Sequence, residues 1–462
     1  MISFDNINKF DRRYDFYNHY LRFTHNYFYY KKFYVVGREN IPPRGVPTFV
    51  ISNHQNALMD ALAILYLFDD SRQPVFIARG DIFKKDFVAR ILRFLKIMPT
   101  FRTRDGNRND IRSNHDTFDL AAKILGEGGT LAMFPEAGHQ HGRYLSTFKK
   151  GFPRIAFRAE EMADFKLGLQ ILPLNIHYSD YFNFRGKLLV TVGKPFQIDE
   201  ALLEMYRNEP NKAYLELNEK SRAIIKEMTL DIQDPEFYDE YDQLRLMLDK
   251  PMANLHRKKV NYLPDLFQED KKIIDNLDKM RAEQPEAFST LMGKTTEYIK
   301  GLKQLKLRDW IINKRFTVMT LIFKALLLLL SFPIFLFGFI NNILPFQFSK
   351  LLKRKVQDKQ FYSSLNYASG VLVAFPLMYI ILLAVVWGIT GHFWMGLLYV
   401  LLTLATLFYF YAYKIYCIKY WASCRYMHFH NTKNATLTHL RELKKEIMEI
   451  YLRFCGEDGA GE

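Results

Sequence analysis

The first 200 residues alternate short apolar runs with stretches of helical periodicity. Apolar runs rich in β-branched and aromatic residues predict strands, because such side chains pack well on a pleated sheet. The predicted strands are 32–37, 47–52, 74–79, 130–135, 169–176 and 188–193. Residues 57–68, 87–95 and 116–125 lie between them and show helical spacing. We therefore predict an α/β domain over 31–200, with a mixed, mostly parallel sheet flanked by helices.

Two later segments are helical in pattern. Residues 201–315 are charged and lack strand signals, which is typical of a solvated helical connector or lid. The tail at 415–462 repeats apolar residues near one helix face, which predicts an amphipathic helix docked on a partner helix or on a membrane surface. The residues of that face are Leu437, Leu440, Ile447, Ile450, Tyr451 and Phe454.

Long apolar runs at 317–345, 370–389 and 393–413 predict a membrane region over 316–414. Each run approaches or exceeds the about 20 residues that a helix needs to cross the hydrocarbon core. Buried core helices of a soluble protein are the alternative. Trp, Tyr and Phe at the edges of the runs favour the membrane, because these side chains settle at its interfaces.

Basic residues predict the orientation of this region. The segment 349–360 and the tail after 413 are basic and are expected in the cytoplasm, whereas the turn at 390–392 has no Lys or Arg. The two later runs then form a hairpin. A cytoplasmic N-terminal domain requires an even number of crossings by 317–345, so we favour a re-entrant helix broken near Pro333. A plain third span, with the N-terminal domain outside, is the alternative.

The N-terminal segment 1–30 mixes aromatic with basic residues. It lacks the basic region and apolar core of a signal peptide. An interfacial helix is favoured, because Tyr settles at the headgroup level while Arg and Lys meet anionic lipid. We expect this segment on the cytoplasmic side of a membrane.

Composition narrows the classes of function. A hydrophobic share of 49% in 462 residues excludes a disordered chain. The formal charge of +15 favours a polyanionic partner: nucleic acid, anionic lipid or a phosphorylated substrate. No recognised nucleic-acid motif accompanies the charge, so no nucleic-acid partner is predicted. The three cysteines fit neither a disulfide framework nor a zinc site and indicate a reducing compartment.

A histidine and an acid follow the predicted strand at 47–52. A carboxylate bound to one ring nitrogen of a histidine fixes the tautomer and leaves the other nitrogen as a base. His54 and Asp60 would lie on different faces of one continuous helix. His54 must therefore lie in a turn, with Asn56 or Ala57 opening the helix that carries Asp60; Asn56 is an acceptable N-cap. A pair of satisfied surface residues is the alternative.

The run at 130–138 ends a predicted strand in Phe-Pro-Glu-Ala-Gly. Pro135 and Gly138 predict a tight turn that projects Glu136 from the strand end, where sites of α/β folds usually lie. A solvated Glu at an ordinary strand exit is the alternative.

Basic residues and histidines follow other predicted elements. Arg102 ends an apolar stretch, and Lys149 and Lys150 precede a glycine that opens a helix. Such side chains bind phosphate, although solvated basic loops are the commoner alternative. His139 and His141 suggest a metal, but their spacing fits no standard template, so we expect no metal site.

In chain order these features resemble the phospholipid/glycerol acyltransferase family, which transfers fatty acyl groups to glycerol phosphates. The family pattern reads Asn-His-x4-Asp, an Ile-Pro-x-x-Arg-like block, Phe-Pro-Glu-Gly, a Lys-x-Gly block and a Leu-Pro-type strand. The similar positions here are Asn53, His54, Asp60, Met98, Pro99, Arg102, 134–138, 149–151 and 172–174. The resemblance covers residues 30–200.

Two features depart from the family pattern. The separation of His54 and Asp60 is one residue longer, which resembles the branch with fungal-type glycerol-3-phosphate and dihydroxyacetone-phosphate acyltransferases. Ala137 stands where the family has Gly, and His139 where it has Arg. Arg102, Arg143 and Lys149 are then the alternatives for the residue that binds the phosphate.

The resemblance implies a mechanism without metal or cofactor. His54 would take a proton from the acceptor hydroxyl, Asp60 would orient His54, and the oxygen would attack the thioester of acyl-CoA or acyl-carrier protein. No Gly-x-Ser-x-Gly motif is present to form an acyl-enzyme. The implied substrate-binding residues are Arg102, Glu136, Gly138, Lys149 and Lys150.

The implied protein is a membrane-bound acyltransferase of phospholipid synthesis, with its catalytic domain on the cytoplasmic face of the bilayer. Its acceptor would be 1-acyl-sn-glycerol-3-phosphate, with glycerol 3-phosphate or dihydroxyacetone phosphate as the alternatives. A catalytically inactive membrane scaffold is an alternative from another class, supported by the two departures. A basic, nucleic-acid-associated membrane protein is a further alternative.

Overall fold

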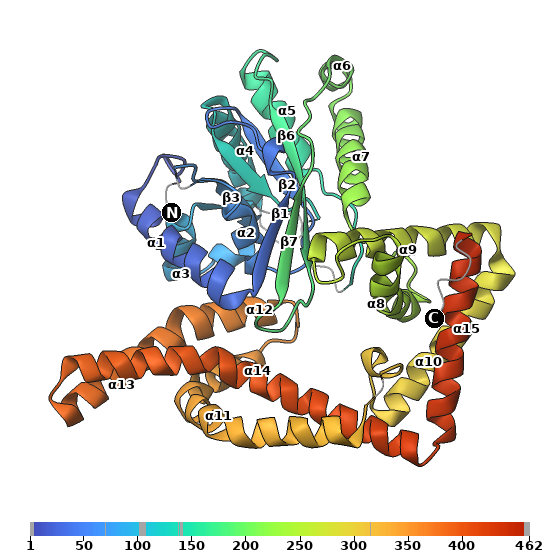
Figure 1. Cartoon of the computed structure of the whole chain (residues 1–462). Coiled ribbons are helices and arrows are strands. Elements are labelled where there is room, and N and C mark those ends of the chain that lie inside the picture. Colours follow the sequence, from blue (N-terminus) through green and yellow to red (C-terminus); the bar gives the residue numbers. More distant parts are fainter. Residues whose placement is uncertain are drawn as a thin grey trace. The chain divides into compact units, whose positions relative to one another are not determined.

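The computed structural model describes residues 4–69, 71–100, 108–136, 138, 142–314 and 316–456, with side chains described outside 108–115. The chain divides into two compact units (Figure 1). The sheet unit consists of Met1–Asp231 together with Val356–Tyr367. The helical unit consists of Ile232–Lys355 together with Ala368–Glu462.

The sheet unit contains a mixed, mostly parallel sheet, as predicted. Among the described residues it has seven strands in the order β1-β7-β6-β2-β5-β3-β4, and only the β6–β7 pair is antiparallel. The strands are β1 Lys32–Val36, β2 Thr48–Ser52, β3 Val75–Arg79, β4 Ile97–Thr100, β5 Thr130–Met133, β6 Gln170–Tyr178 and β7 Lys187–Val192. Strand β2 is buried along its whole length between β5 and β6, so its carboxyl end opens at the centre of the sheet.

Strand β4 was not among the predicted strands. It has four residues, and one of them is Pro99, which has no N–H to donate to a neighbouring strand. The structure tolerates this proline because β4 is the outermost strand of the sheet and pairs on one side only.

Helices pack against the sheet, and the core continues past the predicted boundary at residue 200. Buried Ala213, Leu217 and Ile225 of α7 belong to the same hydrophobic core as residues of β2 and α5. The helices of this unit are α1 Arg12–Phe23, the π-helix η1 Thr24–Tyr29, α2 Leu58–Leu65, α3 Asp86–Phe94, α4 Arg108–Gly126, α5 Gly151–Met162, α6 Glu200–Asn208, α7 Pro210–Met228 and α12 Phe361–Leu365, with short 3-10 turns η2 Arg38–Asn40 and η3 Gly80–Phe83.

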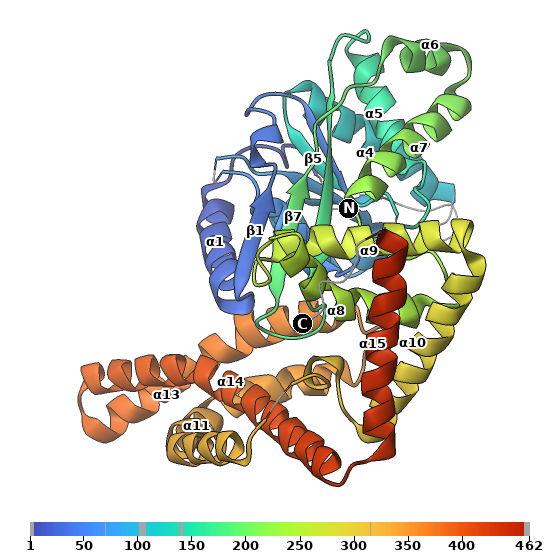
Figure 2. The ribbon, with the colours of Figure 1, turned by 45° about the vertical axis from the view of Figure 1, so that its right-hand side comes forward.

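The helical unit begins after Asp231. Its described elements are α8 Tyr238–Leu255, α9 Leu263–Glu283, α10 Pro285–Leu305, the turn η4 Asp309–Ile311, α11 Val318–Lys353, the π-helix η5 Asn366–Ala374, whose first residues belong to the sheet unit, α13 Phe375–Thr390, α14 Phe393–Asn431 and α15 Ala435–Cys455. The apolar face of α15 packs within the chain. Leu440 of α15 meets Gly301 of α10, and both views of the ribbon show the two helices side by side (Figures 1 and 2). The tail was predicted to dock on a partner helix or on a membrane surface, and in the structure its apolar face packs on helix α10.

Three helices in the described part of the chain are long and apolar enough to cross a membrane, which supports the predicted membrane association. They are Val318–Lys353, Phe361–Thr390 and Phe393–Asn431. Asn342 of the first helix forms hydrogen bonds with the other two. Its Nδ2 donates to the Thr403 carbonyl oxygen at 3.2 Å, and its Oδ1 accepts from the Tyr379 hydroxyl at 2.9 Å. Such bonds satisfy polar groups that are costly in hydrocarbon.

The structure differs from the predicted break near Pro333. Helix α11 runs as one helix through both Pro333 and Pro345. A proline removes one hydrogen bond from a helix, whereas a loop at membrane depth would leave several backbone groups without partners. Ser331 Oγ also donates to the Leu327 carbonyl oxygen at 2.6 Å, one turn before Pro333. Whether α11 crosses the bilayer or leaves by the face it entered stays a prediction.

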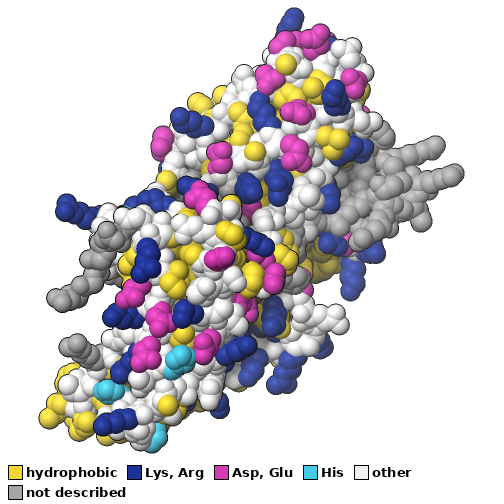
Figure 3. Space-filling model, turned by 90° about the vertical axis from the view of Figure 1, so that its right-hand side faces the viewer, with side chains coloured by type: hydrophobic (Ala, Val, Ile, Leu, Met, Phe, Trp, Pro, Cys, Tyr) yellow, Lys and Arg dark blue, Asp and Glu magenta, His cyan; other side chains and the backbone are white. Residues whose placement is uncertain are grey.

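Charged side chains are mixed over the surface shown in Figure 3. Lys and Arg side chains alternate there with Asp and Glu, and apolar side chains lie between them. The net positive charge of the chain is therefore not gathered into one basic track on this face.

A buried histidine makes the stability of the sheet unit depend on pH. His25 of η1 is fully buried, with the rings of Tyr30 and Tyr66 at 4.9 and 5.0 Å, and burial lowers its pKa to about 4. In the folded state His25 therefore stays neutral down to about pH 4, whereas in the unfolded chain it binds a proton near pH 6.5. We expect the free energy of unfolding to fall by about 3 kcal/mol as the pH drops from about 6.5 to 4.

The measurement is the thermal midpoint of the full chain in detergent at pH 7.0, 5.5 and 4.5. The His25→Phe variant keeps an aromatic ring next to Tyr30 and Tyr66. It is expected to lose less stability on acidification than the wild type. His439→Phe, at an exposed position on α15, is the matched control. Equal acid sensitivity of wild type and His25→Phe would contradict the assignment.

Candidate active site

The turn after β2 is anchored by an asparagine. Asn53 Nδ2 donates to the Ile176 carbonyl oxygen at 3.0 Å, and Asn53 Oδ1 accepts from the Ile176 N–H at 2.8 Å. The side chain thus continues the pairing of β2 with β6 as a peptide group would. This fixes the direction in which the chain leaves the sheet just before His54.

His54 and Asp60 are in direct contact, as the sequence required. His54 Nδ1 lies 2.9 Å from Asp60 Oδ2, the Asp60 side chain is fully buried, and the His54 side chain is 14% exposed. Asp60 Oδ2 also accepts from the N–H groups of Gln55 at 2.8 Å and Asn56 at 2.7 Å. A carboxylate oxygen that accepts these hydrogen bonds commits Nδ1 of His54 as a donor, so the accepting nitrogen is Nε2.

Ala57 accommodates the additional residue between His54 and Asp60. Its backbone has φ 46° and ψ −122°, which non-glycine residues rarely adopt. This bend turns the chain sharply before α2 begins at Leu58, and it brings Asp60 of the first helical turn back to His54. Strain of this kind persists only where surrounding contacts hold it, and it is common at functional sites.

Of the two residues predicted to open α2, the structure has Ala57 at the N-cap. Ala57 occupies the cap position and has no side-chain oxygen, while Asn56 Nδ2 donates to the Tyr181 carbonyl oxygen at 3.2 Å. The Leu58 N–H instead donates to Ser364 Oγ at 3.1 Å. Sequence spacing carries no signal for a cap that comes from more than 300 residues away.

Phe134 supports the other side of the His54 ring. The two rings are stacked with centroids 4.0 Å apart and planes 11° apart. Phe134 follows β5, which pairs with β2, so the parallel sheet brings the Phe-Pro-Glu run beside His54. The ring is therefore held at its edge by Asp60 and on one face by Phe134.

Glu136 links two loops. Its Oε1 accepts from the His54 N–H at 2.8 Å, and its Oε2 accepts from the Ser146 N–H and hydroxyl, both at 2.9 Å. The side chain is buried, with 4% exposure, and this burial raises the pKa of Glu136 against the opposing effect of the three hydrogen bonds. These contacts support a role in positioning His54, while the predicted contact with an acceptor stays a prediction.

Sequence reasoning missed several neighbours of the pair. Tyr178, at the end of β6, donates to Asp60 Oδ1 at 2.7 Å, and the Tyr181 hydroxyl donates to Gln55 Oε1. Tyr178 lies two residues beyond the predicted strand 169–176, and the sequence carries no signal for its role, because hydrogen-bond partners from other strands are set by sheet order. Parallel β2 and β6 are adjacent in the sheet, which places Tyr178 beside the turn.

We expect Tyr178→Phe to lower the catalytic rate only moderately, by about tenfold, because Asp60 keeps its three other donors while one charge-assisted hydrogen bond is lost. The rate and the thermal midpoint of the full chain would both be measured. Tyr298→Phe is a matched control, since Tyr298 is equally buried and donates to Asp309 at 2.7 Å in the helical unit. A loss as large as that of a His54 variant would contradict this estimate.

Arg143 lies beside the same turn. It is 8% exposed, its guanidinium carbon lies 5.0 Å from the ring centroid of Tyr181, and its Nη1 lies 3.4 Å from His177 Nδ1. The neighbouring Gly142 carbonyl oxygen accepts from Gln55 Nε2 at 3.3 Å. Arg143 thus contacts Tyr181, which bonds to Gln55 next to His54, whereas Arg102 lies outside the described residues.

The remaining predicted site residues are less informative. Arg102, His139 and His141 lie outside the described residues. Lys149 is exposed and Lys150 half-buried, just before α5 begins at Gly151, as the sequence predicted. Among the described atoms nothing lies within 4 Å of a Cβ built on Gly138, so no close approach requires glycine there.

Comparison with known proteins identifies this part of the chain. Residues 32–177 match the model of the family described as Acyltransferase. This stretch is an acyltransferase-family domain. The match includes β1 to β5, most of β6 and the turn with His54 and Asp60, and it confirms the resemblance found in the sequence.

Relatives of the acyltransferase domain are named for glycerolipid acylation. A 1-acyl-sn-glycerol-3-phosphate acyltransferase of Borreliella burgdorferi is 28% identical over 33% of this chain and 53% of that protein. The chloroplastic 1-acyl-sn-glycerol-3-phosphate acyltransferase LPAT1 of Arabidopsis thaliana is 26% identical over 31% and 36%. Glycerol-3-phosphate O-acyltransferase 2 of Saccharomyces cerevisiae is 28% identical over 23% and 14%.

The chain thus spans about half or less of the length of these curated relatives. Among solved structures, the 1-acyl-sn-glycerophosphate acyltransferase PlsC of Thermotoga maritima is similar, with 21% identity and a TM-score of 0.31 over 46% of this chain and 78% of that chain.

The geometry of the acyltransferase domain suits proton transfer. A histidine whose Nδ1 is fixed by a buried carboxylate can accept a proton at Nε2 and return it. No cluster of three or more His, Cys, Asp or Glu side chains with ligand geometry occurs among the residues described.

Proposed function

We propose that this protein is a membrane-bound O-acyltransferase that moves a fatty acyl group from a thioester to a hydroxyl of a glycerol phosphate. The observation that carries the proposal is the 2.9 Å contact between His54 Nδ1 and the buried Asp60, at the carboxyl end of a central parallel strand. This is where α/β folds hold their ligands. The names of the relatives supply the substrate class.

In the proposed reaction His54 Nε2 accepts the proton of the acceptor hydroxyl as its oxygen attacks the thioester carbonyl carbon. A C–O bond forms and the C–S bond breaks, and the leaving thiolate takes the proton back from His54. Asp60 stabilises the imidazolium that exists between the two transfers. The donor, acyl-CoA or acyl-carrier protein, binds as a co-substrate, so no covalent acyl-enzyme and no cofactor is required.

We propose 1-acyl-sn-glycerol-3-phosphate as the acceptor, because two of the three relatives described are named for it. Glycerol 3-phosphate is the second candidate, favoured by the longer His54–Asp60 separation and by the yeast relative. In either case we assign the phosphate to Arg143, whose guanidinium is mostly buried beside the catalytic turn. Arg102, Lys149 and Lys150 would add positive potential toward an anionic acceptor and donor.

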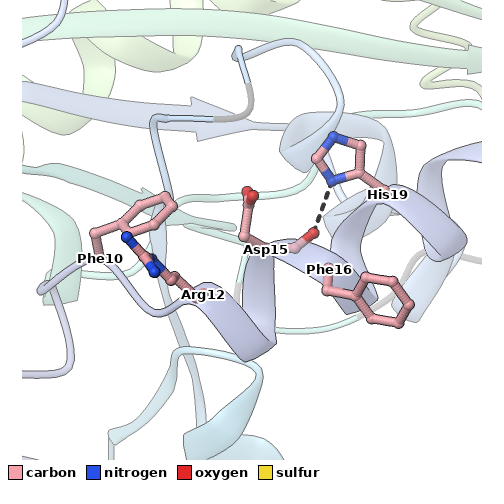
Figure 4. A pocket seen from close by; sticks show the side chains of 5 residues that line it. All are labelled: Phe10, Arg12, Asp15, Phe16 and His19. Carbon is pink, nitrogen blue, oxygen red and sulfur yellow. Dashed lines mark hydrogen bonds between the residues drawn. The ribbon is translucent and has the colours of Figure 1, made fainter.

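We place the sheet unit on the cytoplasmic face of a bilayer, with α1 at the interface. Phe16, Phe23 and Tyr27 recur at helical spacing and are 82%, 60% and 70% exposed. Figure 4 shows Phe16 and Arg12 lining an open pocket on this helix with Phe10, Asp15 and His19. Exposed aromatic rings next to basic side chains are typical of helices that lie in the headgroup region.

The test is an assay of the purified full chain, in nanodiscs, with both acceptors and with acyl-CoA or acyl-carrier protein as donor. We expect acylation of 1-acyl-sn-glycerol-3-phosphate, and we expect Arg143→Ala to raise the KM for the acceptor about tenfold or more without raising that for the donor, as loss of one charged hydrogen bond implies. Arg158→Ala is the control, since Arg158 pairs with Asp119 and Glu161 on the surface.

The other outcomes separate the alternatives. Preference for glycerol 3-phosphate would replace the acceptor and keep the enzyme. Absence of acylation with every donor and acceptor would favour the inactive membrane scaffold. An equal effect of Arg143→Ala and Arg158→Ala would remove Arg143 from phosphate binding.

A further inference from the structure

The segment Val356–Tyr367 belongs to the sheet unit, although it is far from the rest of that unit in the sequence. It lies between two helices that are apolar enough to cross a membrane, and the second of these begins within it at Phe361. It also lies outside the stretch 32–177 that matches the acyltransferase family. Its role is therefore not assigned by that match.

The segment contacts the first helices of the chain. The buried Tyr367 hydroxyl donates to the Leu21 carbonyl oxygen at 3.0 Å and lies 2.9 Å from Thr24 Oγ1. The Tyr29 hydroxyl donates to the Ser363 carbonyl oxygen at 3.3 Å. These bonds hold the segment on α1 and η1 and set the position of the serines that precede Tyr367.

Its two serines reach the catalytic turn. Ser364 Oγ accepts from the Leu58 N–H at 3.1 Å, and Ser363 Oγ donates to the Tyr181 carbonyl oxygen. Both serines are buried, Ser363 to 2% exposure and Ser364 to 8%. The Tyr181 carbonyl oxygen is also the acceptor for Asn56 Nδ2, so both sides of the turn are tied to this segment.

The bond from Leu58 is the one that the turn needs most. The first N–H groups of a helix have no partner within the helix and need acceptors from outside it. The N-cap residue of α2 is Ala57, which offers no side-chain oxygen and has a strained backbone. The hydroxyl of Ser364 supplies the missing acceptor at the point where the strain must be maintained.

We propose that Ser364 is a positioning residue for the acyltransferase reaction: it caps α2 from outside the family domain and holds Ala57, and through it Asp60, in the conformation that orients His54. The proposal rests on the proposed function for its catalytic readout. It also means that the domain carrying His54 is completed by the chain segment that leads into an apolar helix.

The first experiment compares Ser364→Ala with Ser369→Ala in the full chain. Ser369 is a matched control because it is also buried, lies five residues further on and pairs with Ser349 Oγ at 3.0 Å, away from the turn. We expect Ser364→Ala to lower kcat about fivefold while the KM values for donor and acceptor stay within about twofold, since the cap of α2 is lost and the substrate contacts remain. Ser364→Thr keeps the hydroxyl and is expected to restore most of kcat.

A second readout is independent of activity. Hydrogen–deuterium exchange of the peptide covering residues 54–62 is expected to speed up in Ser364→Ala and to stay unchanged in Ser369→Ala and Ser364→Thr. Should Ser364→Ala fail to fold, Ser364→Cys keeps the volume with a weaker acceptor and is expected to lie between wild type and alanine in both readouts.

Each outcome decides. Unchanged exchange at 54–62 in Ser364→Ala, or equal losses of kcat in Ser364→Ala and Ser369→Ala, would overturn the proposal. Faster exchange in a protein whose wild type acylates no acceptor would keep the capping role of Ser364 and reject the proposed function instead.

Discussion

Replacing His54 by alanine is expected to lower kcat for acyl transfer by about a thousandfold, because the variant loses the base that takes the acceptor proton and the positioning that goes with it. The fold should persist. The backbone N–H of residue 54 still donates to Glu136. Steady-state kinetics with saturating donor and acceptor would measure the loss, and the thermal midpoint would confirm folding.

Asp60→Asn gives a companion result. Asp60 Oδ2 accepts from His54 Nδ1 and from the N–H groups of Gln55 and Asn56, and an asparagine oxygen can keep these contacts but carries no negative charge. The rate is expected to fall by about two to four orders of magnitude, since a neutral amide does not stabilise the imidazolium that forms when Nε2 accepts the proton.

The control for both is His439→Ala, at an exposed position paired with Glu297. Retention of more than a tenth of the wild-type kcat in His54→Ala, with normal folding, would remove His54 from the mechanism.

Glu136→Gln is also expected to have a large effect, through the position of the turn that carries His54. The carboxylate accepts three hydrogen bonds, from the His54 N–H and from the N–H and hydroxyl of Ser146. Glutamine can accept at one oxygen only, so at least one buried donor loses its partner at a cost of about 1–3 kcal/mol. The turn with His54 would shift, and kcat is expected to fall about a hundredfold, as a small misplacement of a catalytic group does.

Both the thermal midpoint and kcat would be measured for this variant. Glu161→Gln, at an exposed position in contact with Arg158, is the matched control and is expected to change neither. A fall in kcat with unchanged stability and a raised acceptor KM would indicate that Glu136 binds the acceptor, as the sequence analysis predicted, and does not merely position His54.

Several parts of the fold follow from local sequence pattern. The strand β2 is an uninterrupted apolar run because both faces of a central parallel strand are buried, and this is visible in residues 47–52. The same reasoning located β5 and β6 and placed His54 and Glu136 just after strand ends. Strand β4 escaped because four residues with a proline carry no such pattern.

The membrane region contains a feature that the local sequence pattern did not predict correctly. The apolar length of 317–345 identified a helix that suits a bilayer, but Pro333 suggested a break that α11 does not have. A proline's local cost is the same in any sequence. Whether it breaks the helix depends on what the freed backbone groups would meet, and in apolar surroundings they meet nothing better than the remaining helix.

The sequence by itself determined that a histidine at a strand end and an acid six positions later could form a base, because that inference needs only strand, turn and helix chemistry. Only the tertiary structure decided how the pair is held. Residues after other strands and in a segment beyond residue 350 contact the pair or its turn: Tyr178, Phe134, Glu136 and Ser364. These contacts depend on sheet order and on long-range packing. Hydrogen bonds and ring contacts are short-ranged in space and carry no signature in chain spacing, so they appear only once the chain is folded.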